Sequence, residues 1–187
     1  MKPTVAHRSR PCEGETTCGD VAVVRAAGDS TLLAVVDVLG HGPVAARAAR
    51  VAENHLHSSA APRNVQQALE GLGDALHSHR GAAAFVCRVG GRRIEAAGVG
   101  NVEMRVFGSN FRASPTPGIL GGRVRRLRVF EGELEAGSRL VLFSDGVSAL
   151  FTEEAARDGG PERVCQVLIA EYGLARDDAT VMVADIP

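Results

Sequence analysis

The chain has 187 residues, a formal net charge of −1 and an apolar content of 45%. These values predict one domain, residues 1–187, with a hydrophobic core, and they exclude a disordered chain. A charge so close to neutral disfavours nucleic acid and anionic membranes as partners. No apolar run approaches the roughly 20 residues that a membrane span needs, and the N-terminal segment MKPTVAHRSR is too polar and short for a signal peptide. We therefore expect a cytosolic protein.

The first half of the sequence predicts a hairpin followed by two helices. Residues 20–37 contain two Val- and Leu-rich arms around a turn at residues 28–30, and the second arm ends in Asp37. A proline and an apolar 4-3-4 spacing predict a helix from about residue 43 to the late fifties. Residues 65–80 predict a second helix, although two glycines weaken it.

From residue 82 the sequence changes to short strands separated by turn residues. Several of these strands alternate apolar with charged side chains, which predicts an antiparallel meander with one solvent-exposed face; they cover residues 82–89, 92–99, 102–107 and 124–130. The chain then predicts a continuous apolar strand, a helix and a last strand, over residues 139–144, 161–172 and 179–186. Together these elements predict an α+β domain in which helices cover antiparallel sheets.

Acidic residues stand where apolar strands begin or end. They are Asp20, Asp37, Asp145 and the adjacent pair Asp177 and Asp178. If one sheet edge gathers them, their oxygens suit hard cations such as Mg²⁺ or Mn²⁺. Two such ions, about 3.5–4 Å apart, can share a bridging carboxylate and activate water for in-line attack on phosphorus. A single aspartate of this kind is also typical of a turn or a helix cap, so the positions alone leave a structural role open.

Four motifs in the same order carry a family resemblance: CGD at 18–20, DVLGHG at 37–42, SDGV at 144–147 and DDATVMV at 177–183. They resemble the metal-dependent protein phosphatase 2C family, and more narrowly its bacterial branch with SpoIIE, RsbU and RsbX. The segments GETTCGD, GVGNVEMRV and PTPGILG are similar to the small RsbX-type members. The resemblance runs from residue 13 to the end. It implies a four-layer α-β-β-α sandwich of two antiparallel sheets flanked by helices, with metals at one sheet edge.

The resemblance also implies a role for each matched residue. Asp37 would bridge two metal ions, and the main-chain carbonyl of Val38 would bind one of them, although many members have glycine at that position. Asp145 and Asp177 would hold the second ion. Asp20 would support the first ion, directly or through water.

Other residues near the motifs keep open roles. Asp178 matches a position that is often asparagine in the family. His41 suits proton transfer to the leaving serine oxygen, and a plain loop histidine is the simpler interpretation. Larger eukaryotic members have an upstream glutamate ligand and a phosphate-binding arginine; Glu15 and Arg8 or Arg10 lie nearby, and no alignment assigns them a role.

The resemblance implies a phosphoserine or phosphothreonine protein phosphatase with two Mn²⁺ or Mg²⁺ ions and catalytic residues Asp37 and Asp145. The implied substrates are phosphorylated STAS-domain regulators, either stressosome proteins or anti-anti-sigma proteins, in bacterial stress signalling. Two alternatives remain: a catalytically silent domain that sequesters a partner, and a small-molecule phosphohydrolase. The complete set of motif acids argues against the first. The lack of a recognisable nucleotide- or sugar-binding segment argues against the second.

Overall fold

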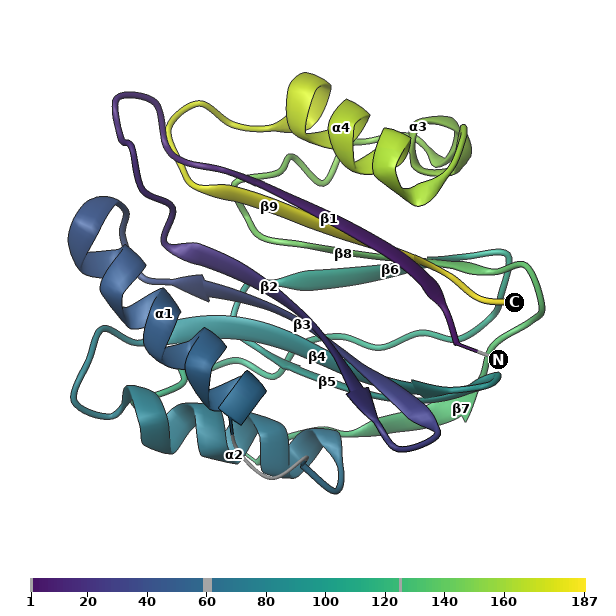
Figure 1. Ribbon diagram of the computed structural model, residues 1–187, viewed down its shortest axis with the longest axis horizontal. Coiled ribbons are helices and arrows are strands. Elements are labelled where there is room, and N and C mark those ends of the chain that lie inside the picture. Colours follow the sequence, from purple (N-terminus) through teal and green to yellow (C-terminus); the bar gives the residue numbers. More distant parts are fainter. Residues whose placement is uncertain (1, 59–61, 125) are drawn as a thin grey trace.

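The computed structural model describes residues 2–58, 62–124 and 126–187. Two antiparallel sheets pack face to face, and helices cover both outer sides (Figure 1). The described strands are β1 (Thr4–Arg10), β2 (Asp20–Ala27), β3 (Ser30–Val38), β4 (Ala82–Gly90), β5 (Arg93–Val99), β6 (Glu103–Phe107), β7 (Phe130–Glu133), β8 (Arg139–Phe143) and β9 (Ala179–Asp185). The described helices are α1 (Gly42–Ser58), α2 (Val65–Leu76), α3 (Glu153–Arg157) and α4 (Pro161–Tyr172). The predicted four-layer α-β-β-α sandwich is confirmed.

Each sheet pairs with its own helices. The first sheet has the strand order β2-β3-β4-β5-β7 and lies against α1 and α2. The second sheet has the order β1-β9-β8-β6 and lies against α4. In Figure 1 the two chain ends lie near each other, on the side of the molecule away from the α1 N-terminus. Among the described residues, no helix has the length and apolar character that a bilayer crossing requires.

The alternation of side chains along β3 explains the layers. Leu32, Ala34 and Val36 point toward α1 and α2, whereas Leu33 and Val35 point between the sheets. A strand with apolar residues on both faces must be covered on both faces, and β3 is an interior strand, between β2 and β4. Its near-continuous apolar sequence therefore fits an interior strand of a four-layer domain.

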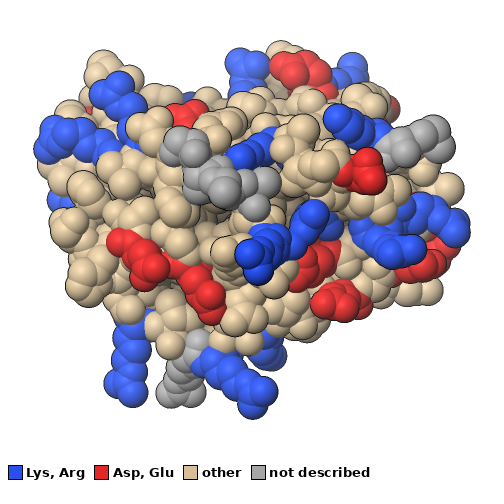
Figure 2. Space-filling view, turned by 60° about the horizontal axis from the view of Figure 1, so that its bottom comes forward, with Lys and Arg blue, Asp and Glu red and all other residues tan. Residues whose placement is uncertain are grey.

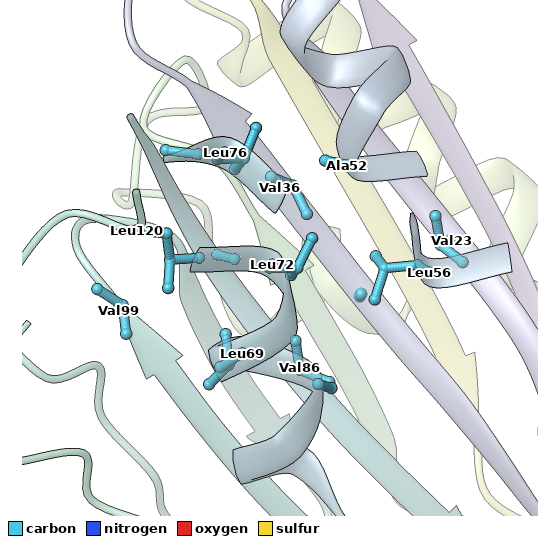
Figure 3. Packing of buried hydrophobic residues seen from close by; sticks show 14 of the residues in the cluster. Val23, Val36, Ala52, Leu56, Leu69, Leu72, Leu76, Val86, Val99 and Leu120 are labelled. Atoms are coloured by element: carbon cyan, nitrogen blue, oxygen red, sulfur yellow. The ribbon is translucent and has the colours of Figure 1, made fainter. Parts of the chain in front are cut away.

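Leucines from α2 close the outer core. Leu69, Leu72 and Leu76 recur at helical spacing and are almost completely buried. Figure 3 shows them directed at Val36 and Val86 of the sheet. Asn64 caps the helix, since its side chain accepts a hydrogen bond of 2.8 Å from the amide of Gln67.

Most predicted elements are present, with shifts at their ends. The hairpin, the helix after residue 42, and the strands and helix of residues 139–186 are confirmed. The second helix ends at Leu76 rather than at residue 80. Two elements were not predicted from the sequence: β1, an edge strand paired with β9, and the short helix α3.

The predicted meander is wrong in two respects. Strand β6 leaves the first sheet and pairs with β8 of the second, so the strands of residues 82–133 do not form one meander. Strands β4 and β5 are buried on both faces, because helices lie on one side and the second sheet on the other. Residues 126–129 are not in a strand, and β7 begins at Phe130. Arg125, in the predicted strand, lies outside the described residues.

Candidate functional site

Strand pairing brings Asp20 and Asp37 together. The two residues are direct partners in the antiparallel pair of β2 and β3, at the open end of the hairpin. Period-two alternation puts both on the face that meets the second sheet, in line with Ala22 of β2 and Val35 of β3. Because each strand ends here, the two carboxylates lie at the edge of the inter-sheet core rather than within it.

The second sheet contributes acids from β8 and β9 to the same edge. Asp145 follows β8, and Asp177 precedes β9, which is hydrogen-bonded to β8. Gly146 permits this approach, since a Cβ on it would lie 1.8 Å from the carbonyl oxygen of Asp178. The two loops are therefore in direct backbone contact, and glycine is the residue that fits between them.

A hydroxyl relay connects Asp20 to the second sheet. The amide of Thr180 donates to Ser144 Oγ at 2.9 Å, and Ser144 Oγ donates to Asp20 Oδ2 at 2.7 Å. Asp20 is 6% exposed, and its other oxygen, Oδ1, is buried without a hydrogen-bond partner among the described residues. Burial raises the pKa of Asp20 to about 7, the Ser144 hydrogen bond opposes the rise, and the charge of Asp178 adds to it. The hydrogen bond from Ser144 thus orients the Asp20 carboxylate through Oδ2, and Oδ1 stays available for another ligand.

Asp37 lies between the acids of both sheets. Burial raises the pKa of Asp37 to about 9, and the charges of Asp20 and Asp145, a hydrogen bond with Asp145 and the charge of Asp177 add to the rise. Burial also raises the pKa of Asp177, followed by the charge of Asp145. Crowded carboxylates of this kind repel one another unless a proton or a cation lies among them.

The carboxylate oxygens at this edge are the type of ligand that a hard divalent cation prefers, although they do not surround a single point. Within the described parts of the chain, no three His, Cys, Asp or Glu side chains are close enough to enclose one ion as they stand. The acids come instead from two sheets and lie around a shared edge, with a buried oxygen unpaired. Mg²⁺ and Mn²⁺ tolerate few protein ligands, because water and substrate phosphate complete their coordination. The residues present therefore fit such a site.

Asp178 has a structural role in the fold. Its Oδ1 accepts a hydrogen bond from the amide of Cys12 at 2.8 Å, and its Oδ2 accepts one from the amide of Gly19 at 2.7 Å. The side chain is 3% exposed. Asp178 thus joins the start of β9 to the segment that leads into β2, directly before Asp20.

The remaining predicted residues lie around this edge. The amide of Val38 donates to the carbonyl of Gly19 at 3.2 Å, and its side chain is buried. His41 is exposed, and its Nδ1 donates to Glu15 Oε1 at 3.0 Å. Arg10 donates from Nη2 to the carbonyl of Leu174 at 2.7 Å.

Arg8 lies on β1 and is exposed; β1 pairs with β9. The structure thus brings Glu15 next to the proposed acid His41, and it directs Arg10 at the loop before Asp177.

Two polar residues at the site were not assigned a role from the sequence. Ser144 orients Asp20, as described above. Asn101, in the loop between β5 and β6, donates from Nδ2 to Asp145 Oδ2 at 2.5 Å. The signals were the serine directly before Asp145 in SDGV and the asparagine in GVGN, but their partners are 124 and 44 residues away in sequence. Only the packing of the two sheets shows those contacts.

Comparison with known proteins places the chain in a family. The sequence profile of Stage II sporulation protein E (SpoIIE) matches residues 27–187. The phosphoserine phosphatase RsbX of Bacillus subtilis (strain 168) is 27% identical over 180 residues, which cover 93% of this chain and 90% of RsbX.

Two solved structures share the whole fold. One, reported for the bacterial stressosome as a modular system adapted to control secondary messenger signaling, has a TM-score of 0.90 and 31% identity, covering 98% of this chain and 100% of that chain. The other, RsbX in complex with magnesium, has a TM-score of 0.85 and 23% identity, covering 98% of this chain and 94% of that chain. The matched range, residues 27–187, spans the positions of Asp37, Asp145 and Asp177. The chain therefore belongs to the Stage II sporulation protein E (SpoIIE) family, within the protein phosphatase 2C type that its four motifs resemble.

Proposed function

We propose that the protein is a Mn²⁺- or Mg²⁺-dependent phosphatase that acts on phosphoserine or phosphothreonine in a protein, and that residues 1–187 form one phosphatase domain. The observation that carries this proposal is the gathering of acids from both sheets around Asp37, with a buried oxygen of Asp20 that has no hydrogen-bond partner among the described residues. A purely structural set of aspartates would be expected to have its buried oxygens hydrogen-bonded. Two of these acids are instead desolvated and close to one another.

The residues that would hold two ions are the predicted ones. Asp37 would bridge them, the Val38 carbonyl and Asp20 would serve the first, and Asp145 and Asp177 the second. Divalent cations at this edge supply the activated water for hydrolysis and the positive charge that stabilises the phosphoryl transition state. The chain itself fixes the carboxylates, through Ser144 at Asp20 and Asn101 at Asp145.

His41 and Glu15 suit the proton transfer to the leaving group. The Glu15 carboxylate accepts the proton on His41 Nδ1, which fixes the ring and leaves Nε2 for a substrate oxygen. The pKa of Asp177 is raised by burial and by the charge of Asp145, and a positive charge on His41 opposes that rise, which places His41 near the Asp177 carboxyl. We propose that the His41 ring, protonated on both nitrogens and paired with the Glu15 carboxylate, donates its Nε2 proton to the serine or threonine oxygen as the phosphate leaves, and is then neutral with its remaining proton on Nδ1.

The substrate proposal rests on the relatives. RsbX is named a phosphoserine phosphatase, and the structure with a TM-score of 0.90 is reported for the bacterial stressosome. By analogy, we propose that the substrates are phosphorylated STAS-domain proteins of the stressosome or anti-anti-sigma type, and that the protein works in the cytoplasm.

The test is hydrolysis of p-nitrophenyl phosphate by chelator-treated protein, with Mn²⁺ or Mg²⁺ added back. Wild type should require the metal, and Asp37→Asn should lose at least ~10³-fold in kcat, the order expected when a central electrostatic group is removed. Asp29→Asn is the matched control, because Asp29 is an exposed aspartate in the β2–β3 turn, at the far end of the hairpin from Asp37.

The alternatives give different results in the same assay. A phosphoserine STAS protein and free phosphorylated metabolites would be compared as substrates at equal metal concentration. Faster turnover of a metabolite would favour the small-molecule phosphohydrolase. A folded wild type without turnover on any substrate would favour the silent binding domain and would contradict the proposal.

A further inference from the structure

Exposed apolar side chains gather beside the proposed catalytic edge. In the described residues, four large hydrophobic side chains are exposed, namely Leu39, Val44, Ile119 and Leu150. Leu39 and Val44 belong to the segment that leads from Asp37 into α1. Leu39 follows Asp37 by two positions, so their Cα atoms are at most about 7.6 Å apart.

Ile119 comes from a distant part of the chain to the same place. A Cβ built on Gly81 would lie 2.2 Å from Ile119 Cγ2 and 3.4 Å from Leu39 Cδ1. Both side chains therefore lie over the bare backbone of Gly81. We call Leu39 and Ile119, with Gly81 beneath them, the apolar ledge. Leu39 is 44% and Ile119 42% exposed, so the ledge is open to solvent.

The backbone under the ledge is fixed by hydrogen bonds. The amide of Leu39 donates to the carbonyl of Gly81 at 2.9 Å, and Ala82 and Leu120 exchange bonds of 3.1 and 2.8 Å. Arg80 Nη1 donates to the carbonyl of Leu39 at 3.1 Å.

The guanidinium of Arg80 also lies over Gly40, where a Cβ would be 2.3 Å from Nη1. Gly40 has a φ of +80°, so glycine suits it in conformation as well as in space. Hydrogen bonds thus fix the loop that carries Leu39 before any ligand binds. Pre-organised apolar contacts of this kind favour binding, because little conformational entropy is lost.

Surface charge offers no comparable source of recognition on the helical side. Figure 2, which brings the α1 and α2 side forward, shows acidic and basic side chains interspersed. The net charge of the whole chain is −1. This face therefore offers no patch of a single charge that could select a protein substrate.

We propose that the apolar ledge receives an apolar side chain of the protein substrate, within about three residues of the phosphorylated one. This inference rests on the proposed function, because a phosphorylated residue whose phosphate reaches Asp37 brings its sequence neighbours to the ledge. An extended peptide advances ~3.3 Å per residue, which sets the reach of three residues. Leu39 and Ile119 are specificity residues and take no part in the chemistry.

The experiment uses synthetic heptapeptides of alanine with a central phosphoserine, in which leucine is placed at each other position in turn. With Mn²⁺, wild type should hydrolyse at least one leucine peptide with a kcat/KM roughly tenfold above the all-alanine peptide, as partial burial of a leucine allows. Leu39→Ser and Ile119→Ser should each reduce that ratio toward one. Both should keep the wild-type rate on p-nitrophenyl phosphate, which has no neighbouring residues.

Two further variants separate the ledge from general effects. Gly81→Ala should reduce the same ratio, because its Cβ displaces Ile119. Leu150→Ser removes a side chain that is 86% exposed and lies in the segment between β8 and α3, and it should leave the ratio unchanged.

Three results would overturn the inference. The first is a wild type that hydrolyses all the peptides equally. The second is a leucine preference that survives in both ledge variants. The third is a dimer in sedimentation that Leu39→Ser or Ile119→Ser dissociates, which would assign the ledge to a second copy of the chain. Failure of wild type on p-nitrophenyl phosphate as well as on every peptide would instead contradict the proposed function.

Discussion

The carboxylate of Asp37 opposes folding when no cation is bound. Its pKa is raised by burial and by neighbouring acids, so the folded chain holds a proton that the unfolded chain releases. For an acid with a raised pKa, the stability of the folded state is greatest below the ordinary carboxyl range and falls as the pH rises toward the folded value. The metal-free protein should therefore lose stability between about pH 4 and pH 9.

Replacement of Asp37 tests this electrostatic cost. In the presence of chelator, Asp37→Asn should raise the Tm at pH 8 by several degrees and should change it less at pH 5, because wild-type Asp37 is already neutral there. About 1 kcal/mol corresponds to ~2–4 °C in a chain of this size. Thermal unfolding of both proteins at the two pH values measures the difference. A variant less stable than wild type at pH 8 would show that the acids do not repel one another.

Substitution of Asp177 and of the adjacent Asp178 should have opposite effects on stability and activity. Asp178→Ala leaves the buried amides of Cys12 and Gly19 without their acceptor, at ~1–3 kcal/mol each, so we expect a loss of roughly 2–5 kcal/mol. Asp177 is partly exposed, and Asp177→Ala should cost little stability but most of the metal-dependent activity. Urea unfolding and p-nitrophenyl phosphate hydrolysis separate the two effects. Equal loss of stability in both variants would contradict the assignment.

These residues show which parts of the site the sequence reveals. Asp37 and Asp20 could be placed together because hairpin pairing and strand alternation are local rules. The bonds of Ser144 to Asp20 and of Asp178 to Cys12 join different sheets or segments more than a hundred residues apart. No pattern within one segment predicts such a contact, so it required the structure.

Gly71 and Gly73 of α2 differ in the space that is available for a side chain. A Cβ on Gly71 would lie 2.5 Å from His55 Nε2 of α1, whereas a Cβ on Gly73 would meet only ordinary contacts at 3.8 Å or more. Gly73→Ala should therefore stabilise the protein by about 0.5–1 kcal/mol through helix propensity. Gly71→Ala should stabilise it less, because the His55 ring must move to make room for the new Cβ. Chemical denaturation of the pair measures this, and an equal gain in both variants would mean that the helices are not closely packed at Gly71.

A helix or strand could be predicted where its own segment determines the structure. The sheet to which a strand belongs could not be predicted where this depends on a distant strand. The helices of residues 42–58 and 161–172 followed from apolar spacing and an N-terminal proline. The assignment of β6 to the second sheet depends on β8, which is more than thirty residues later. Strand β1 was missed because its sequence is polar; as an edge strand it needs only partial burial and the register of β9.

The proposed site connects the two halves of the molecule. Asp20 and Asp37 belong to the sheet under α1 and α2, and Asp145 and Asp177 border the sheet under α4. A cation shared by these acids would therefore join the two sheets at one edge. Binding to the folded state alone stabilises it by about 2.7 kcal/mol at a hundred times the Kd.

Added Mn²⁺ should accordingly raise the Tm of the chelator-treated wild type by roughly 5–10 °C at saturating concentration. Asp37→Asn should show a much smaller shift, since it loses the carboxylate between the sheets, while Asp29→Asn in the distant hairpin turn should match wild type. Hydrogen exchange should slow at both the β2–β3 and β8–β9 ends, because one ion would restrain both sheets. Protection of only one sheet would show that metal does not bridge them, and an equal shift in Asp37→Asn would place the binding site elsewhere.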